Sequence, residues 1–423
     1  MVIDTHRPEV TGARHTLRLM AEPLTDPAET AATSANAVSP RRAVSSALTT
    51  TIACSVPVFL VGGLAVQIGH ELGFSPAGLG LAVSAYFGAS ALASVPAGAL
   101  VERYGSTAIA RAGIGLAAAC LLTIAVAARS LWSLIAILAL GAAANAMGQL
   151  ASNTSLSRHV PVRRQGLSFG VKQAAIPVST LLAGAAVPAV ALTVGWRWAF
   201  VLAAAGATAA LWLVPVERAD RRSARGGGGE RATAALVVIG VGATLAAGSA
   251  NALGTFLVDS AVADGVAPAA AGLALTLGSA VGVAARIVDG WLADRMPDRQ
   301  ISVIAGMLAV GAAGLGVLSV LNPATLIAGV VLGFGLGWAW PGLMNFAVVR
   351  LHPQAPAAAT SITQTGVYAG GCLGPLSLGT IAAAAGYPTM WTVAAIAMLW
   401  AAAAMVIGGR MLRRHADRTV AAA

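Results

Sequence analysis

Long apolar stretches separated by short polar loops set the pattern of this 423-residue chain. A helix needs about 20 mostly apolar residues to cross the ~30 Å hydrocarbon core of a bilayer. Twelve stretches reach that length, at 45–68, 76–100, 107–128, 131–154, 166–190, 196–215, 232–258, 268–292, 301–320, 324–349, 357–384 and 388–410. The pattern therefore predicts an all-α integral membrane protein with twelve transmembrane helices.

Composition agrees with that prediction and excludes several other classes of protein. Hydrophobic residues make up 57% of the chain and charged residues 10%, whereas soluble domains carry about 25% charged residues. Cys54, Cys120 and Cys372 all lie in apolar stretches, so the sequence predicts neither a disulfide framework nor a metal site. The net charge of +10 comes from arginines in short loops, which indicates membrane orientation rather than binding of nucleic acid.

The placement of these arginines predicts which way the protein faces. They concentrate in alternate loops and near both ends of the chain, and only Arg129 and Arg197 fall in the opposite loops. Because positively charged loops stay on the cytoplasmic side, we expect a multi-pass protein of the cell inner (plasma) membrane with both termini in the cytoplasm. Residues 1–43 lack the order of a signal peptide and are predicted to be a disordered cytoplasmic tail. Residues 411–423 are predicted to form a second cytoplasmic tail.

The chain also repeats itself at an offset of 192 residues. The aligned pairs are Gly98 with Gly290, Glu102 with Asp294, Arg103 with Arg295, Asn153 with Asn345, Arg158 with Arg350 and Pro161 with Pro353. A charged, glycine-rich linker at 216–231 separates the segments 44–215 and 232–410. Two six-helix halves related by a parallel repeat are a known transporter architecture.

At these motifs the chain resembles the major facilitator superfamily, over residues 44–410. The loop after the second helix in that family reads roughly G-x-L-a-D-R-x-G-R, and "GALVERYG" at 98–105 follows it with Glu in place of Asp. The copy "GWLADRMP" at 290–297 keeps the acid and the arginine. The resemblance implies alternating access with a cytoplasmic gate, and the matching gate residues are Gly98, Glu102, Arg103, Gly290, Asp294 and Arg295.

Three ionisable residues fall inside predicted spans: Lys172, the only lysine of the chain, and Arg286 and Asp289. Such residues cost roughly 2.5–3.5 kcal/mol each on insertion scales and usually face a cavity. Lys172 and Arg286 lie at similar depth in different halves, which predicts an anion site between them. Two alternatives stay open: Lys172 reaching along its helix to the interface, and Arg286 pairing with Asp289 three residues later.

Two further resemblances bear on the substrate. The segment "ARIVDGWLADR" resembles helix 8 of monocarboxylate and oxalate transporters, where an arginine four residues before the glycine binds a carboxylate; Arg286 holds that place before Gly290. The segment "GVKQAAIP" resembles helix 5 of bacterial cyanate and nitroimidazole permeases. The helix-5 glycine pattern of multidrug exporters is absent, although the proline is present.

Other polar residues lie on helices that line the cavity in this architecture. The additional substrate-binding candidates are Gln173, Asn145, Gln149, Asn251, Gln364 and Tyr368. For these side chains, hydrogen bonding between helices is as good an explanation as contact with a substrate.

The sequence predicts a secondary transporter of a small solute, most simply an organic or inorganic anion. With a single lysine, followed by Gln173, no phosphate-binding GxxxxGK[ST] motif can be written, so this chain does not hydrolyse ATP. Asp289 is the candidate for proton coupling. A proton-coupled drug efflux transporter and a non-transporting receptor or scaffold are the alternatives. We expect no enzyme activity, no cofactor and no metal. The expected partners are the lipid bilayer and a small solute, and we expect a monomer that does not bind nucleic acid.

Overall fold

A computed structural model describes residues 38–215, 233–295, 300–320, 323–351 and 356–421. The chain divides into a unit from Met1 to Ser39 and a compact unit from Pro40 onwards, and the fold described below is that of the second unit. The predicted linker at 216–231 and most of the predicted N-terminal tail lie outside the described residues.

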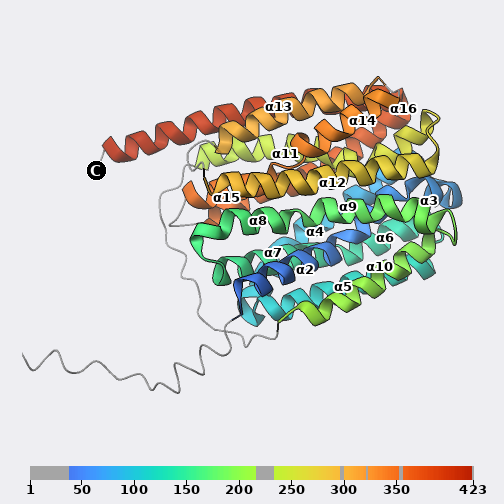
Figure 1. The fold of residues 1–423 in the computed structure, drawn as a ribbon, viewed down its shortest axis with the longest axis horizontal. Coiled ribbons are helices and arrows are strands. Elements are labelled where there is room, and N and C mark those ends of the chain that lie inside the picture. The colour runs from blue at the N-terminus through green and yellow to red at the C-terminus, as the bar shows by residue number, and fades with distance from the viewer. Residues whose placement is uncertain (1–37, 216–232, 296–299, 321–322, 352–355, 422–423) are drawn as a thin grey trace, which may run out of the picture. The chain divides into compact units, whose positions relative to one another are not determined.

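The compact unit is built from helices that run side by side (Figure 1). In chain order they are α2 (Pro40–Gly63), α3 (Ala65–Leu72), α4 (Pro76–Tyr104), α5 (Ser106–Ala127), α6 (Leu131–Gly141), α7 (Ala143–His159), α8 (Gln165–Gln173), α9 (Ala175–Ala186), α10 (Trp196–Ala210), α11 (Thr233–Ala263), α12 (Pro268–Ala293), α13 (Gln300–Leu318), α14 (Pro323–Leu332), α15 (Pro341–Leu351) and α16 (Pro356–Ala421). Short 3-10 or π segments are η1 (Val162–Arg164), η2 (Val187–Ala191), η3 (Leu211–Leu213) and η4 (Gly333–Gly337).

The predicted number of membrane crossings is confirmed. Among the described residues, 11 helical segments are long and apolar enough to span a membrane, and the last of them, Thr363–His415, has 53 residues. At about 1.5 Å per residue that segment is far too long for one crossing. Gly386, with φ 83°, breaks its helical backbone, so α16 consists of two crossing helices. The second of these continues to Ala421, past the predicted end at 410.

Left-handed glycines confirm the internal repeat in the backbone itself. Gly73 (φ 68°) and Gly265 (φ 85°) follow the first helices of the two halves and lie 192 residues apart. Gly195 (φ 100°) and Gly386 (φ 83°) precede the last helices and lie 191 apart. Because only glycine adopts such φ values readily, both halves turn at matching places.

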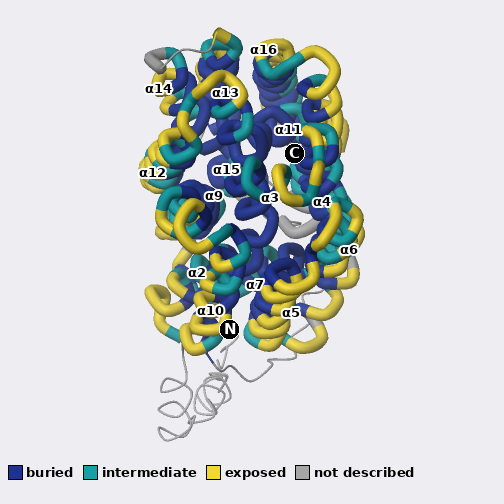
Figure 2. The backbone as a smooth tube through the Cα atoms, turned by 90° about the vertical axis from the view of Figure 1, so that its right-hand side faces the viewer, coloured by how far each residue is buried: buried dark blue, intermediate teal, exposed yellow. Residues whose placement is uncertain are grey.

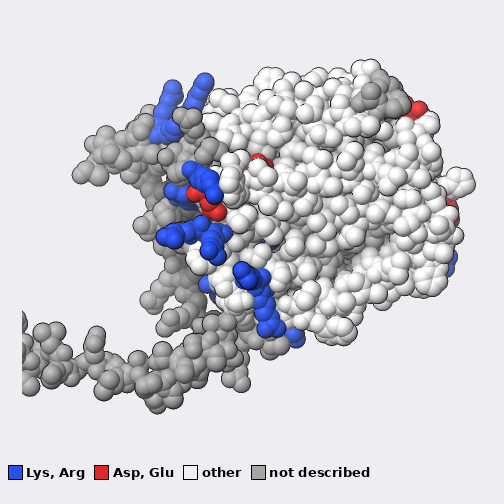
Figure 3. All heavy atoms as spheres, viewed as in Figure 1, with Lys and Arg blue, Asp and Glu red and all other residues white. Residues whose placement is uncertain are grey.

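Burial and charge are distributed as a bilayer requires. Exposed residues face outward around the bundle and buried residues face its interior (Figure 2). The visible flank has almost no charge, whereas basic side chains, all arginines, gather at the end where α2 and α8 begin and α12 ends (Figure 3). We call this the basic end. Large exposed apolar side chains such as Leu92 and Leu140 would contact lipid.

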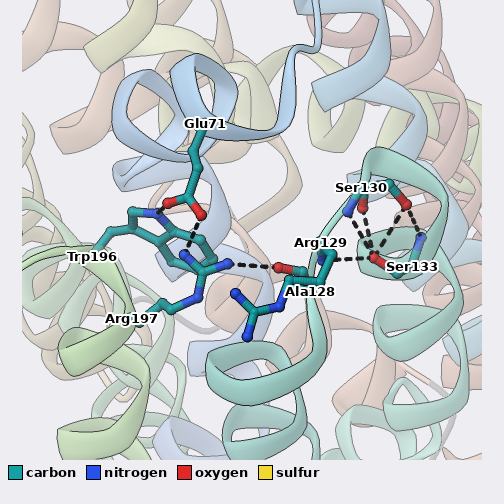
Figure 4. Close-up of polar contacts among 7 residues, drawn as sticks. All are labelled: Glu71, Ala128, Arg129, Ser130, Ser133, Trp196 and Arg197. Carbon is teal, nitrogen blue, oxygen red and sulfur yellow. Dashed lines mark hydrogen bonds and ion pairs between the residues drawn. The ribbon is translucent and has the colours of Figure 1, made fainter.

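A polar clamp joins three helices at the end opposite the basic end (Figure 4). Arg197, at the start of α10, forms an ion pair of 2.5 Å with Glu71 of α3 and donates to the carbonyl of Ala128, which follows α5 (2.8 Å). The indole N–H of Trp196 donates to the other carboxylate oxygen of Glu71 (2.7 Å), and the Arg197 guanidinium lies 4.2 Å from the centroid of the same indole. The hydrogen bond from Arg197 is the main reason that the pKa of Glu71 lies below its usual value.

The clamp predicts a pH-dependent contribution to stability. Because the pKa of Glu71 is depressed in the folded protein, its contribution is present above its unfolded pKa of about 4.3 and is lost as the pH falls through the folded value. We expect Glu71→Gln to lower the unfolding free energy at neutral pH by roughly 0.2–1 kcal/mol, since the pair is partly exposed. Thermal unfolding across pH checks this. Asp264→Asn is the control, because partial burial raises the pKa of the Asp264 carboxyl, which is the opposite direction to Glu71. A Glu71→Gln deficit that persists unchanged in acid would contradict the assignment.

Candidate functional site

Lys172 lies in the interior of the protein, near the end of α8. Its side chain is 1% exposed, so the alternative in which it reaches to the interface is wrong. The ammonium donates to the side-chain carbonyl oxygen of Gln149 on α7 and to that of Gln173 (3.3 Å). The predicted candidates Gln149 and Gln173 are therefore the immediate partners of the buried lysine.

Arg286 reaches the same place from α12, in the other half of the chain. It is 3% exposed, and its guanidinium donates to the backbone carbonyls of Gln173 (3.0 Å) and Trp338. The guanidinium also lies 5.7 Å from the centroid of the Trp338 ring. Lys172 and Arg286 thus meet at one residue, Gln173, which bonds the lysine through its side chain and the arginine through its backbone.

Breaks in two helices make these carbonyls available. In a continuous helix the carbonyl of Gln173 would accept from the N–H of residue 177, but that residue is Pro177, which has no N–H. Trp338 lies in the non-helical turn (φ −119°, ψ 5°) that separates the π segment η4 from α15, which Pro341 begins. Both acceptors for Arg286 therefore exist because the local sequence interrupts a helix.

The site carries two buried cations and only neutral acceptors in direct contact with them. No ion pair joins Arg286 to Asp289 among the described residues: the guanidinium bonds the two backbone carbonyls, and Oδ2 of Asp289 is buried without a hydrogen-bond partner. The hydrogen-bonded pairing of Arg286 with Asp289, which the sequence left open, is therefore not present in the structure. The Nε of Arg286 is also without a partner within the described part of the chain. A buried positive charge is costly unless an anion is near, so the arrangement favours an anionic ligand.

The two halves are closed against each other at the basic end. Asp294, directly after α12, accepts hydrogen bonds from the backbone N–H groups of Gly166 (3.0 Å) and Leu167 (3.1 Å) in the first turn of α8. A carboxylate at a helix N-terminus is favourable, because the unpaired N–H groups and the helix dipole attract it. A little deeper, a Cβ added to Gly170 would lie 3.0 Å from the Cα of Gly290, so both positions need glycine for α8 and α12 to approach this closely.

The remaining predicted gate residues lie elsewhere. Arg295 stacks its guanidinium 3.6 Å from the centroid of the Trp291 ring, and Arg103 lies 5.3 Å from that of Tyr104. A Cβ added to Gly98 would meet no described atom within 4 Å, and the side chain of Glu102 is outside the described residues. Asp294 and Gly290 therefore form the described part of the contact, and a gating role for either copy of the motif stays a prediction.

Four other substrate candidates have hydrogen-bond partners, within the described residues, other than Lys172 and Arg286. Asn145 donates to Ser90 (3.3 Å), and Asn251 donates to the carbonyl of Ala247 in its own helix (2.7 Å). Gln364 is hydrogen-bonded to Tyr368. These contacts fit the alternative of helix packing, and substrate binding by these residues stays a prediction.

The sequence reasoning missed the backbone at Trp338 and the side chains that connect the halves beside it. The Trp338 ring packs edge-on against Phe59 of α2 at 5.8 Å between centroids. Thr180 and Ser279 join α9 to α12 through a buried hydrogen bond of 2.7 Å. The sequence held one signal for the acceptor of Arg286. Pro177 follows Gln173 by four residues, which indicates that the backbone carbonyl of Gln173 is free to accept a hydrogen bond from Arg286.

Comparison with known proteins identifies the family. A model of the Major Facilitator Superfamily matches residues 46–239 and again residues 239–422, one match for each half of the repeat. The chain belongs to the Major Facilitator Superfamily. Members of this family are transporters rather than enzymes. The match is to the superfamily as a whole and does not support the resemblance to the cyanate or oxalate branches.

One relative shares part of the sequence. The puromycin resistance protein pur8 of Streptomyces alboniger is 31% identical over 134 residues, which are 30% of this chain and 25% of that protein. The similarity thus spans about a quarter of the relative's length.

The contact at Asp294 predicts how this superfamily member opens. Hydrogen bonds to a charged group contribute about 1.5–3 kcal/mol each, so Asp294→Ala should increase amide hydrogen exchange in the first turn of α8 by roughly tenfold or more. Hydrogen exchange read by mass spectrometry on peptides that cover Gly166 and Leu167 checks this. Asp259→Asn, which alters the acceptor for Tyr387 at the opposite end, is the control. Unchanged exchange in Asp294→Ala would mean that its carboxylate does not hold the basic end closed.

Proposed function

We propose that this protein is a secondary transporter that moves a small anion by alternating access, with Lys172 and Arg286 as the residues that recognise its charge. The observation that carries the proposal is the pair of buried cations whose direct hydrogen-bond partners are all neutral among the described residues. Membership of a transporter superfamily and the contribution of one cation by each half support it.

The chemistry of the two cations indicates a division of roles. A guanidinium presents paired donors that match a carboxylate or a similar oxyanion in a bidentate way, and it stays charged when buried. An ammonium acts as a compact point charge with three donors, and Lys172 uses two neutral oxygens as partners in this structure. An anion that approaches Arg286 would replace hydrogen bonds to neutral carbonyls by hydrogen bonds between opposite charges. A small carboxylate or inorganic oxyanion is therefore the proposed substrate class.

The proposed membrane orientation and domain boundaries are those that the sequence predicts. We place the basic end in the cytoplasm of the plasma membrane, with both termini on that side, because arginine-rich loops are retained there. The proposed domains are the halves 44–215 and 232–410 joined by the linker 216–231, acting as a monomer. A swing of one half against the other would break the contact of Asp294 with α8 and open the site toward the basic end.

Drug efflux is the second candidate, favoured by the similarity to a puromycin resistance protein. It differs from the first in the ligand that should stabilise the protein. Puromycin is the compound that tests it, and stabilisation by puromycin with no response to anions would replace the anion proposal by this one.

The anion proposal predicts a defined binding pattern for the purified protein. Thermal unfolding is followed with a series of small carboxylates and inorganic oxyanions, with chloride held constant. We expect at least one of them to stabilise the wild type. Arg286→Lys and Lys172→Gln should weaken its binding about 10–100-fold, because each removes charge-assisted hydrogen bonds of roughly 1.5–3 kcal/mol.

Arg197→Lys is the matched control, since it makes the same exchange in the clamp at the opposite end. It should lower stability without changing the anion response. If no anion stabilises the wild type, or if Arg286→Lys binds as the wild type does, Lys172 and Arg286 do not form an anion site.

A further inference from the structure

An apolar groove runs along the flank of the first half. Its walls are α9 with η2 on one side and α10 with η3 on the other, and α2, which lies between these helices, forms its floor (Figures 1 and 2). The floor residues Ala53, Val56 and Leu60 are buried, whereas Leu182 and Leu202 on the two walls are 46% and 56% exposed. The groove therefore opens outward, toward the surrounding lipid.

The lining of the groove selects an apolar occupant. Its volume of about 570 Å³ lies within the range of roughly 300–1,000 Å³ that is usual for ligand sites. No charged or aromatic side chain lines it among the described residues, and Thr49 supplies the one hydroxyl there. That hydroxyl donates to the carbonyls of Ser45 (3.0 Å) and Ser46 (3.2 Å) in its own helix. A polar ligand thus finds no partner in the groove, and a hydrocarbon chain fits its chemistry.

The groove is part of the helix packing. A buried hydrogen bond of 2.8 Å between Ser55 and Ser179 holds α2 against α9. The face of α10 toward the groove carries alanine or glycine at most positions, and a Cβ added to Gly206 would meet no described atom within 4 Å. Small side chains on this face leave the space that larger ones would fill.

The length of the groove matches one layer of a bilayer. Thr49 and Leu60 both line the groove and lie eleven residues apart on α2, which is about 16 Å at 1.5 Å per residue. One leaflet accounts for about half of the ~30 Å hydrocarbon core. Because the groove runs along helices that cross the membrane, an extended lipid chain can lie in it.

The end of the groove toward the basic end carries a positive charge. Leu213 lines the groove there, and the carbonyl of the next residue, Val214, accepts a hydrogen bond from the exposed Arg111 of α5 (3.1 Å). No carboxylate pairs with Arg111 within the described part of the chain. Trp212 is 87% exposed, and tryptophan is enriched where a membrane meets water. Arg111 therefore lies at the depth of the lipid headgroups.

Charge decides which lipid this site favours. Lipid tails are as apolar as the groove, so a chain that enters it gains close packing but no hydrophobic free energy. A headgroup phosphate at Arg111 gains a charge-assisted hydrogen bond in addition. Since phosphatidylcholine carries a compensating cation, an anionic headgroup should be preferred.

We propose that this groove is a binding site for a phospholipid with an anionic headgroup, which places one acyl chain between α9 and α10 and its headgroup at Arg111. The site takes a component of the membrane and is separate from the buried cations of the proposed transport site. The bound chain would support α9 from the lipid side, while on its other side Thr180 of α9 bonds Ser279 of α12 (2.7 Å).

Native mass spectrometry of the full chain tests the site. The protein is extracted from vesicles of equal parts phosphatidylglycerol and phosphatidylcholine, and the lipid that stays bound is identified. We expect the wild type to retain one phosphatidylglycerol. Gly206→Leu should remove it, because the leucine enters the open groove. Arg111→Gln should reduce the preference for phosphatidylglycerol about fivefold, the usual effect of one cation near a membrane surface.

Both variants have a matched control on α5. Gly115 is another exposed helical glycine at which an added Cβ would meet no described atom within 4 Å, so Gly115→Leu makes the same exchange outside the groove. Arg129→Gln removes an exposed arginine at the opposite end of the protein. These two controls should retain phosphatidylglycerol as the wild type does.

Three outcomes would overturn the proposal. The first is equal retention of both lipids by the wild type, and the second is the same retention of phosphatidylglycerol by Gly206→Leu and Gly115→Leu. The third is a dimer that Gly206→Leu abolishes while the bound lipid is unchanged, since the groove would then hold a second copy of the chain. Ala203→Phe, one turn away on the same wall, repeats the test if thermal unfolding shows that Gly206→Leu does not fold.

Discussion

Two buried positive charges without a directly bonded counter-anion among the described residues are the constraint around which this structure is organised. Lys172 and Arg286 are as buried as the core leucines. The groups that bond them directly are neutral carbonyl and amide oxygens, and the nearby charge of Asp289 also favours the charged form of Arg286. Charge in such surroundings is destabilising unless it is well partnered. A protein that needed only stability would replace both residues by apolar ones, so their presence is best explained by a ligand that completes the site.

The breaks in the helices follow from the same constraint. A continuous helix has no free carbonyl to offer in its middle, and a buried guanidinium needs several acceptors. Pro177 frees the carbonyl of Gln173, and the π segment before Pro341 frees that of Trp338. Irregular backbone is tolerated at membrane depth where it is buried in protein. Each half thus supplies one broken helix, and Arg286 spans from one to the other.

The sequence was sufficient for the fold and for the identity of the charged residues, but not for their partners. Long apolar stretches, arginine-rich loops and the 192-residue repeat are each local or additive signals, and the crossings and matching glycine turns confirm the first and the last of them. Which acceptor Arg286 uses depends on how α8, α12 and the η4 turn pack together, which periodicity does not encode. Asp289, three residues from Arg286, was for that reason a plausible partner of Arg286 in the sequence. In the structure, Arg286 instead donates to the backbone carbonyls of Gln173 and Trp338, which belong to other segments.

In the proposed function, the geometry of α12 would couple substrate recognition directly to gating. Arg286, Gly290 and Asp294 are spaced by four residues and so form one stripe of that helix. The stripe faces α8, where it meets in turn the carbonyl of Gln173, the backbone of Gly170 and the first-turn amides. In the proposed function, an anion that draws Arg286 away from Gln173 would weaken the same helix pair that Asp294 joins at the basic end. Since the two contacts share one rigid helix, a ligand that binds more tightly to the open arrangement shifts the gate by that difference in affinity.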